Sequence, residues 1–447
     1  MDLQEQKSYA AAVEVYEQIA ALEPQAAEPF LAMGHIYLTQ GRWPLAEDAF
    51  NRALSRDAES AEAWAGLATA RWERGDRLHA VSLWESALAR WSDDPKRDRA
   101  DTDLSDIRLR LALAYLDTDQ PAKAENLFHQ EVEDFDTPVA HLYLAMMQAT
   151  GRPAGARREL EAIGEDAPAP VVAARDYFLE ALARAEAAAT AAGAAKVMGL
   201  AFVQAGEWQL AHAALDQALA LDPTDAEARA FLGHTRSQLG RPAFAYLARA
   251  VEEQPDWALG HYMLGLYYFK QEVYDLAEEE LQTTLRLDPG NAQALADLAR
   301  IYVQKGQYFA AEEALAQAVA SEPDDPAFHS ALVHFYAGHA FQISQKGLPA
   351  AQAAIALTPQ DPQAYDMLGW MYLLAGDPQQ AQVHLESALS LDPELASAHY
   401  HLGILRKVMG QEEAARYALM RAIDLDTDGF YREQAQKALS EIARARE

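Results

Sequence analysis

Residues 258–325 consist of two consecutive 34-residue segments that carry similar residues at equivalent positions. When the two segments are aligned, the matching pairs are Leu264 with Leu298, Gly265 with Ala299, Tyr268 with Tyr302, Ala277 with Ala311 and Pro289 with Pro323. A fixed period of this length indicates stacked repeats, because each short unit buries its apolar face only against its neighbours. For a chain of 447 residues, the period therefore favours a repeat array over a single globular core.

Each unit is predicted to form two helices joined by a turn. In residues 27–60, Phe30, Met33 and Tyr37 share one helix face because they lie three and four residues apart. Gly41 should end this first helix in the left-handed conformation. Helices of roughly 12–14 residues are too short to be stable alone in water, so packing must stabilise them. Small residues at the eighth position of the units should allow the paired helices to approach closely.

The same pattern divides almost the whole chain into repeats. We expect a half-repeat helix in residues 1–26, beginning near Ser8, and an alanine-rich spacer helix or decayed repeat in residues 171–191. The first helix that should pair with this half-repeat is absent, so either upstream sequence has been removed or belongs to another region, or residues 1–7 simply fray in solvent. A charged insertion occupies residues 95–104, and residues 430–447 should form a polar capping helix. The repeats form an N-terminal sub-array, 27–170 (27–60, 61–94, 105–138 and 139–170), and a C-terminal array, 192–429 (192–225, 226–257, 258–291, 292–325, 326–361, 362–395 and 396–429).

Composition excludes several classes of function. The chain has 37 basic and 68 acidic residues, and a net charge of −31 opposes binding to nucleic acid. The chain contains no cysteine, which excludes disulfides, thiolate metal sites and cysteine nucleophiles. No apolar run approaches the length of a membrane span, so no direct membrane insertion is expected. The first residues lack the features of a secretory signal, which favours the cytoplasm. A periplasmic or envelope-associated location stays open, because removal of an N-terminal anchor would leave the same sequence.

The residue pattern resembles that of the tetratricopeptide repeat. The shared pattern is bulky–x2–Leu–Gly/Ala–x2–Tyr in the first helix, then Ala–x3–Phe/Leu–x2–Ala–x4–Pro in the second. The resemblance extends over about eleven units. It implies an all-α fold, a right-handed α-solenoid of helix pairs whose first helices line a concave groove. It also implies that the groove binds a peptide or protein and that the chain is not an enzyme.

No catalytic, metal or cofactor motif was found. The sequence lacks HExxH, phosphate-binding glycine loops and the GxSxG nucleophile motif. His329, His334 and His339 come closest to a metal cluster, but a spacing of five residues turns successive side chains apart on a helix. We therefore predict no catalytic residues, no metal and no cofactor.

Candidate binding residues follow from the resemblance, which implies that first-helix positions two, five, nine and twelve to thirteen face the ligand. In the N-terminal repeats these positions form an acidic zone of Glu28, His35, Glu62, Trp72, Glu73, Asp106 and Asp117. In the C-terminal repeats they form an aromatic zone of Tyr262, Leu266, Phe269, Lys270, Arg300, His334, Trp370, Tyr400 and Lys407. Aromatic and arginine residues are common at binding hot spots. Alternatively, these aromatic residues only pack between neighbouring units.

Three functional hypotheses follow. The leading one is a non-catalytic scaffold that binds an extended peptide or a helix of a partner protein. A basic segment of the partner would meet the acidic zone, and apolar residues would insert among Tyr262, Phe269 and Trp370. The second is a regulatory or assembly module of a larger polypeptide or cell-envelope complex. The third is an enzyme whose site no motif reveals. A clamp for the C-terminal tail of a chaperone is not expected, since none of the three asparagines, Asn51, Asn126 and Asn291, occupies a groove position.

Overall fold

The computed structural model describes residues 3–93, 102–426 and 429–444. Within these ranges the chain forms 25 α-helices, one π-helical turn and no strand, so the predicted all-α repeat solenoid is confirmed. Among the described helices, none combines the length and the apolar character needed to cross a membrane. Most of the charged insertion predicted at residues 95–104 lies outside the described residues, and its last three residues belong to helix α6.

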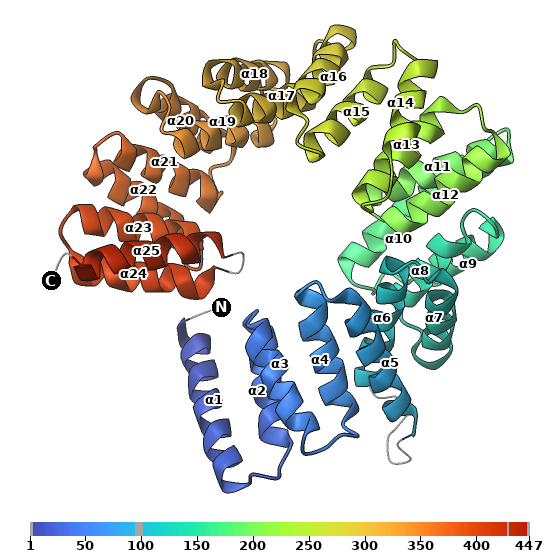
Figure 1. Cartoon of the computed structure of the whole chain (residues 1–447), viewed down its shortest axis with the longest axis horizontal. Helices are drawn as coiled ribbons and strands as arrows, with labels where there is room; N and C mark the ends of the chain where they lie inside the picture. The colour runs from blue at the N-terminus through green and yellow to red at the C-terminus, as the bar shows by residue number, and fades with distance from the viewer. Residues whose placement is uncertain (1–2, 94–101, 427–428, 445–447) are drawn as a thin grey trace. The chain divides into compact units, whose positions relative to one another are not determined.

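The chain divides into two compact units, residues 4–253 and 254–447. The helices of the first unit are labelled in Figure 1 and have the following bounds: α1 (Leu3–Leu22), α2 (Glu28–Thr39), α3 (Trp43–Leu54), α4 (Ala61–Glu73), α5 (Arg77–Asp93), α6 (Thr102–Asp117), α7 (Pro121–Phe135), α8 (Pro138–Gln148), α9 (Pro153–Ala162), α10 (Ala169–Glu186), α11 (Ala191–Ala205), α12 (Trp208–Leu221), α13 (Ala226–Gln238) and α14 (Phe244–Glu253).

The second unit continues the same helical pattern. Its elements are α15 (Ala258–Lys270), α16 (Tyr274–Leu287), α17 (Ala292–Gln304), α18 (Tyr308–Ser321), α19 (Pro326–His339), the π-helical turn η1 (Ile343–Gly347), α20 (Leu348–Leu357), α21 (Pro362–Leu374), α22 (Pro378–Leu391), α23 (Ala396–Val408), α24 (Glu412–Leu425) and α25 (Phe430–Arg444).

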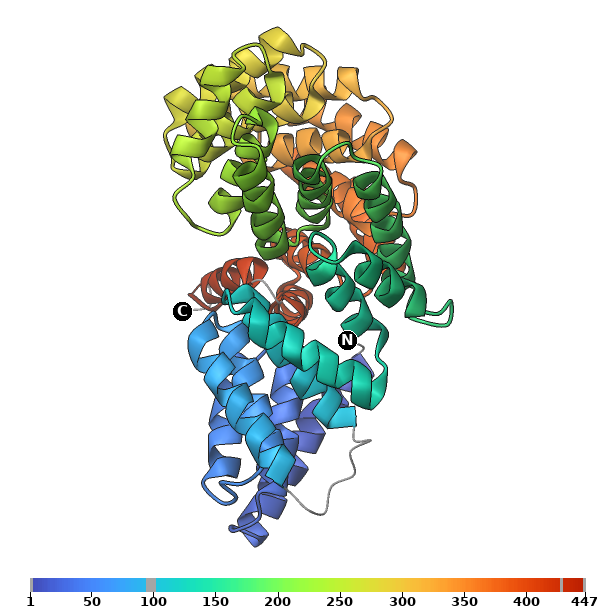
Figure 2. The ribbon, with the colours of Figure 1, turned by 90° about the vertical axis from the view of Figure 1, so that its right-hand side faces the viewer.

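Helix pairs stack in order along each unit. A first helix packs on the second helix of its own pair, as α11 does on α12 and α21 on α22. It also contacts the first helix of the next pair, so that α2 meets α4 and α21 meets α23. Figure 2 shows these successive pairs from the side. We call the side of a unit that its first helices line the first-helix face.

Two glycines show why small residues recur at the eighth repeat position. A Cβ atom added to Gly199 on α11 would lie 2.7 Å from Cγ of Leu215 on α12. A Cβ atom on Gly369 of α21 would lie at the same distance from Cγ of Leu385 on α22, and 3.0 Å from the backbone nitrogen of Leu385. Both leucines are fully buried. The close approach predicted for the paired helices is thus confirmed at these positions.

At three turns between repeats, a histidine of the following helix contacts a backbone carbonyl of the turn. The Nε2 atoms of His261, His329 and His399 each lie 2.9 Å from the carbonyl oxygen of the proline six residues earlier. These contacts link the first turn of α15, α19 and α23 to the end of the preceding repeat. His329, examined in the sequence as a metal candidate, therefore makes a local structural contact.

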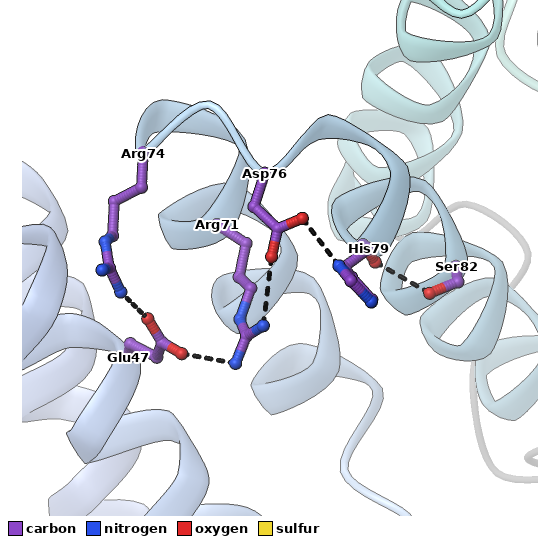
Figure 3. A network of polar contacts seen from close by, with 6 residues as sticks. All are labelled: Glu47, Arg71, Arg74, Asp76, His79 and Ser82. Atoms are coloured by element: carbon purple, nitrogen blue, oxygen red, sulfur yellow. Dashed lines mark hydrogen bonds and ion pairs between the residues drawn. The ribbon is translucent and has the colours of Figure 1, made fainter.

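A polar network joins the helix pair α2–α3 to the next pair, α4–α5 (Figure 3). Glu47 on α3 accepts ion pairs from Arg71 at 2.5 Å and from Arg74. Arg71 also contacts Asp76 at 3.2 Å, and Asp76 contacts Nδ1 of His79 at 2.7 Å. The hydrogen bond with His79 and, after it, that with Arg71 lower the pKa of Asp76, although partial desolvation opposes them. The Ser82 hydroxyl donates to the carbonyl of His79.

Three segments differ in detail from a regular repeat. Helix α1 begins at Leu3, five residues before the start predicted near Ser8. Helix α10 occupies much of the predicted spacer range 171–191 and packs against α8, α9 and α11. In the repeat 326–361, Ala340 and Gln342 have positive φ angles of 47° and 45°, next to η1. Gly41 has the predicted left-handed conformation, with φ of 65°.

Candidate partner-binding surface

The acidic zone predicted for the N-terminal repeats lies on α2, α4 and α6. Glu28 is exposed in the first turn of α2. His35 and Glu62 connect α2 to α4, with 2.9 Å between Nε2 and Oε1. Asp106 pairs with Arg110 on its own helix, at 2.7 Å. These four residues thus lie on successive first helices, but they do not form a single cluster.

Three other predicted residues are brought together in a pocket of about 380 Å³. Trp72 and Glu73 come from the last turn of α4, and Asp117 ends α6. The volume lies at the lower end of the range of about 300–1,000 Å³ that is typical of ligand pockets. The full set of lining residues is Thr69, Trp72, Glu73, Trp84, Arg110, Leu113, Ala114, Leu116, Asp117, Tyr143 and Glu207.

Eight of the eleven lining residues were not among the sequence candidates, and two of these eight, Tyr143 and Glu207, contact each other. Tyr143 occupies position five of the irregular repeat 139–170. Position five is one of the groove positions, so the repeat pattern could have identified Tyr143 as a candidate. Glu207 lies in the turn between α11 and α12, which no groove position covers. The Tyr143 hydroxyl donates a hydrogen bond to Oε1 of Glu207 over 3.1 Å. The pocket therefore combines three successive first helices, α4, α6 and α8, with a turn that follows much later in the chain.

Polar contacts hold this later turn beside the end of α6. The side-chain amide of Gln209 donates to the carbonyl oxygen of Asp117 over 3.2 Å. Arg241, in the following repeat, donates to the side-chain oxygen of Gln209 at 3.1 Å and pairs with Asp119 at 3.0 Å. These contacts position Glu207 at the pocket. Gln209 and Asp117 are 92 residues apart in sequence, which explains why the repeat period alone could not predict their contact.

The pocket has a negative electrostatic character. Burial raises the pKa of the Glu207 carboxyl, the hydrogen bond from Tyr143 opposes part of this rise, and the charge of Asp117 adds to it. Burial, followed by the charges of Glu207 and Asp117, raises the pKa of the Tyr143 hydroxyl. The only lining arginine, Arg110, pairs with Asp106 outside the pocket. A cationic group would therefore be favoured there over an anionic one.

Part of the predicted aromatic zone surrounds Asp297, which is 5% exposed. The hydroxyl of Tyr262 donates to this carboxylate at 2.7 Å, and Arg300 pairs with it at 2.9 Å. The guanidinium of Arg300 also lies 4.7 Å from the ring centroid of Phe269. Leu266 is half-buried on the same helix as Tyr262, and Lys270 is exposed at its end. These side chains link α15 to α17.

The remaining aromatic candidates lie farther along the second unit. Trp370 stacks on His401 with 4.4 Å between ring centroids, and Tyr400 lies 5.6 Å from Tyr431. His401 in turn contacts the buried carboxylate of Asp366 at 2.7 Å. These rings pack first helices against one another, which is the alternative role considered for them in the sequence.

Lys407 and His334 complete the set of sequence candidates. Lys407 pairs with Glu441 on α25 at 2.5 Å. Nδ1 of His334 lies 2.8 Å from the carbonyl oxygen of Ser330. His334 also borders a second pocket, of about 370 Å³, with acidic groups from Asp366, Asp392, Glu394 and Asp426 in its lining. Within the described residues, no group of three or more His, Cys, Asp or Glu side chains is arranged to hold a metal ion.

Family models described as tetratricopeptide repeat match several parts of the chain. One model matches residues 3–71 and 268–333, a second matches 196–256 and 226–292, and a third matches 362–395. A search among curated protein sequences found no match.

Three of the solved structures that resemble this chain are compared with it by sequence identity, TM-score and coverage. A crystal structure of the APC/C hetero-tetramer Cut9-Hcn1 shares 13% sequence identity and a TM-score of 0.40, with 98% of this chain and 94% of that chain covered. Yeast Tom70 shares 15% identity and a TM-score of 0.41, with 94% and 96% covered. YrrB, a TPR protein with an unusual peptide-binding site, shares 22% identity and a TM-score of 0.34, with 43% and 97% covered.

Proposed function

Because this chain belongs to the tetratricopeptide repeat family, we propose that it is a non-catalytic scaffold that binds a partner protein on its first-helix face. The partner would be held as an extended peptide or as a helix. Repeat proteins of this family are typically scaffolds for protein interactions, and peptide recognition by a helical array needs a continuous face with exposed side chains.

The observation that carries the proposal is the pocket between α4, α6 and α8. Trp72, Glu73 and Asp117 come from corresponding positions near the ends of α4 and α6, and Tyr143 adds a ring from α8. Repetition of the helix pair thus assembles polar and aromatic side chains at one hollow of the surface. Such a combination of aromatic walls with a few convergent polar groups is typical of binding sites.

We further propose that the partner has basic and apolar parts. The net charge of −31 attracts basic segments and repels acidic ones. Tyr262, Phe269 and Trp370 would contact apolar side chains of the partner. Their rings are already held by Asp297, Arg300 and His401, so little side-chain entropy would be lost on binding.

Site-directed photo-crosslinking of the full chain tests this function. Benzoylphenylalanine is introduced at Glu73, on the rim of the pocket, or at Glu133, an exposed residue of the second helix α7. After illumination in an extract of the source cells, we expect the position at Glu73 to capture a partner that the position at Glu133 does not. Equal capture at both positions, or capture at Glu133 alone, would contradict the proposed binding face.

A further inference from the structure

The pocket of Trp72, Glu73, Asp117, Tyr143 and Glu207 contains more acidic groups than the molecule itself neutralises. Asp117 pairs with Arg77 at 3.1 Å. Among the described residues, no ion pair is found for Glu73 or Glu207. Glu207 is half-buried and accepts a hydrogen bond from Tyr143, which leaves its negative charge uncompensated. A partly desolvated carboxylate without a cation carries a free-energy cost, so a cationic ligand would gain from entering.

The walls of the pocket are aromatic and fixed in position. The rings of Trp72 and Trp84 lie 5.5 Å apart, and Trp84 is 3% exposed. Tyr143 stacks on Phe128 with 5.3 Å between ring centroids. In addition, the buried Nε1 atom of Trp84 has no hydrogen-bond partner among the described residues. A ligand therefore meets preformed ring faces beside the carboxylates.

An arginine of the chain already uses this combination of groups at the edge of the pocket. The guanidinium of Arg77 lies 5.2 Å from the ring centroid of Trp72 while it donates to the carboxylate of Asp117. Arginine is suited to such a place because its planar guanidinium stacks on an aromatic face and presents several donors at once. Lysine has a compact, strongly hydrated charge and cannot stack in this way. The contact of Arg77 thus indicates which kind of cation the remaining groups fit.

We propose that this pocket receives an arginine side chain of the partner protein, with its guanidinium bound by Glu73 and Glu207 against the aromatic wall. The inference rests on the proposed function and adds the chemistry of the partner's anchoring residue. A pocket of about 380 Å³ has room for one long side chain and not for a folded element. Arg77 lies over Trp72 at the rim and would flank the bound arginine, because its own charge is compensated by Asp117.

Binding of labelled nonapeptides to the full chain tests the proposal. The probe is Gly-Ser-Ala-Arg-Ala-Arg-Ala-Ser-Gly, compared with versions that carry lysine or the neutral isostere citrulline in place of arginine. Fluorescence anisotropy at low ionic strength should show the tightest binding for arginine, with weaker binding for lysine. The citrulline version should bind at least about tenfold more weakly, since it lacks the charge that the carboxylates of Glu73 and Glu207 recognise.

Matched variants separate the pocket from the general negative charge of the chain. Glu73→Gln and Glu207→Gln should each weaken binding of the arginine peptide by about fivefold or more. Glu180→Gln, on α10 and outside the pocket lining, removes the same charge and should change binding less than about twofold. Circular dichroism of each variant checks that it is folded.

Four outcomes would overturn the proposal. They are unchanged binding in both pocket variants, an equal loss in Glu180→Gln, binding of the citrulline peptide as tight as that of the arginine peptide, and binding of free arginine as tight as that of the peptide. If these occur while crosslinking at Glu73 still captures a partner, the scaffold function stands and only the arginine assignment fails. If crosslinking fails as well, the proposed function fails with it.

Discussion

The hydroxyl of Tyr143 donates a hydrogen bond to the carboxylate of Glu207, which follows it by 64 residues in the chain. This bond joins a first helix, α8, to a turn between two later helices, α11 and α12. It shows that the first unit builds a local site from elements that are not neighbours in the repeat order. The site is therefore a property of this chain and not of the repeat as such.

Glu207→Gln is expected to stabilise the chain at neutral pH. The pKa of Glu207 is raised in the folded state, so the stability linked to its protonation is present below the unfolded pKa and is lost as the pH rises through the folded pKa. At pH 7 the charged carboxyl is therefore a cost that glutamine removes, and the melting temperature should rise by up to about 3 °C.

Thermal unfolding at pH 7 and pH 4 checks this prediction. The difference in melting temperature between Glu207→Gln and the wild type should be smaller at pH 4, where the wild-type Glu207 carboxyl takes up its proton. Glu180→Gln serves as the control and should change the melting temperature little at either pH. A lower melting temperature for Glu207→Gln at pH 7 would show that the charged form of Glu207 stabilises the fold.

Two glycine-to-alanine changes in the second unit should have opposite effects. Gly369→Ala places a methyl group 3.0 Å from the backbone nitrogen of Leu385, so α21 and α22 must separate, and the free energy of unfolding should fall by about 1–3 kcal/mol. Gly338, also helical, has no atom within 4 Å of an added Cβ. Gly338→Ala should leave the stability unchanged or raise it by up to about 1 kcal/mol. Urea unfolding measures both, and equal losses would contradict the role of close helix approach.

His384→Phe should make the second unit less sensitive to acid. The His384 ring stacks on Tyr372 with 5.2 Å between centroids, and burial lowers its pKa. A lowered folded pKa means that stability is present above the unfolded pKa and is lost as the pH falls below it, because the unfolded chain takes up a proton that the folded chain resists.

Phenylalanine keeps the ring contact but cannot be protonated. Its stability advantage over wild type should therefore grow as the pH falls from 8 to 5, by about 1 kcal/mol at most. Melting curves of both proteins at several pH values measure this advantage, with the exposed His129→Phe as control. If the advantage stays constant with pH, protonation of His384 does not contribute to acid unfolding.

The sequence period predicted the fold well, because the residues that pack each helix pair lie within one unit and recur in the next. Gly199 and Gly369 occupy the predicted small position and contact the predicted second helix. Trp72, Glu73 and Asp117, which the family resemblance placed at groove positions, line one pocket, since helix pairs of equal length present the same positions on the same face.

Other parts of the site do not follow from the period. Glu207 lies in a turn, and it reaches the pocket through contacts of Gln209 and Arg241 with residues far away in sequence. The phase also could not show that Tyr262 and Trp370 would be engaged by Asp297 and His401. Whether these two aromatic side chains bind a partner therefore stays a prediction.

The most direct test of the pocket is deuterium exchange of the full chain with and without the arginine nonapeptide at saturating concentration. If the peptide binds where we propose, exchange should slow in the last turns of α4 and α6, in α8 around Tyr143 and in the turn that contains Glu207, while the second helix α7 should exchange as before. Protection confined to α7 or other second helices, or no protection at saturation, would contradict the account.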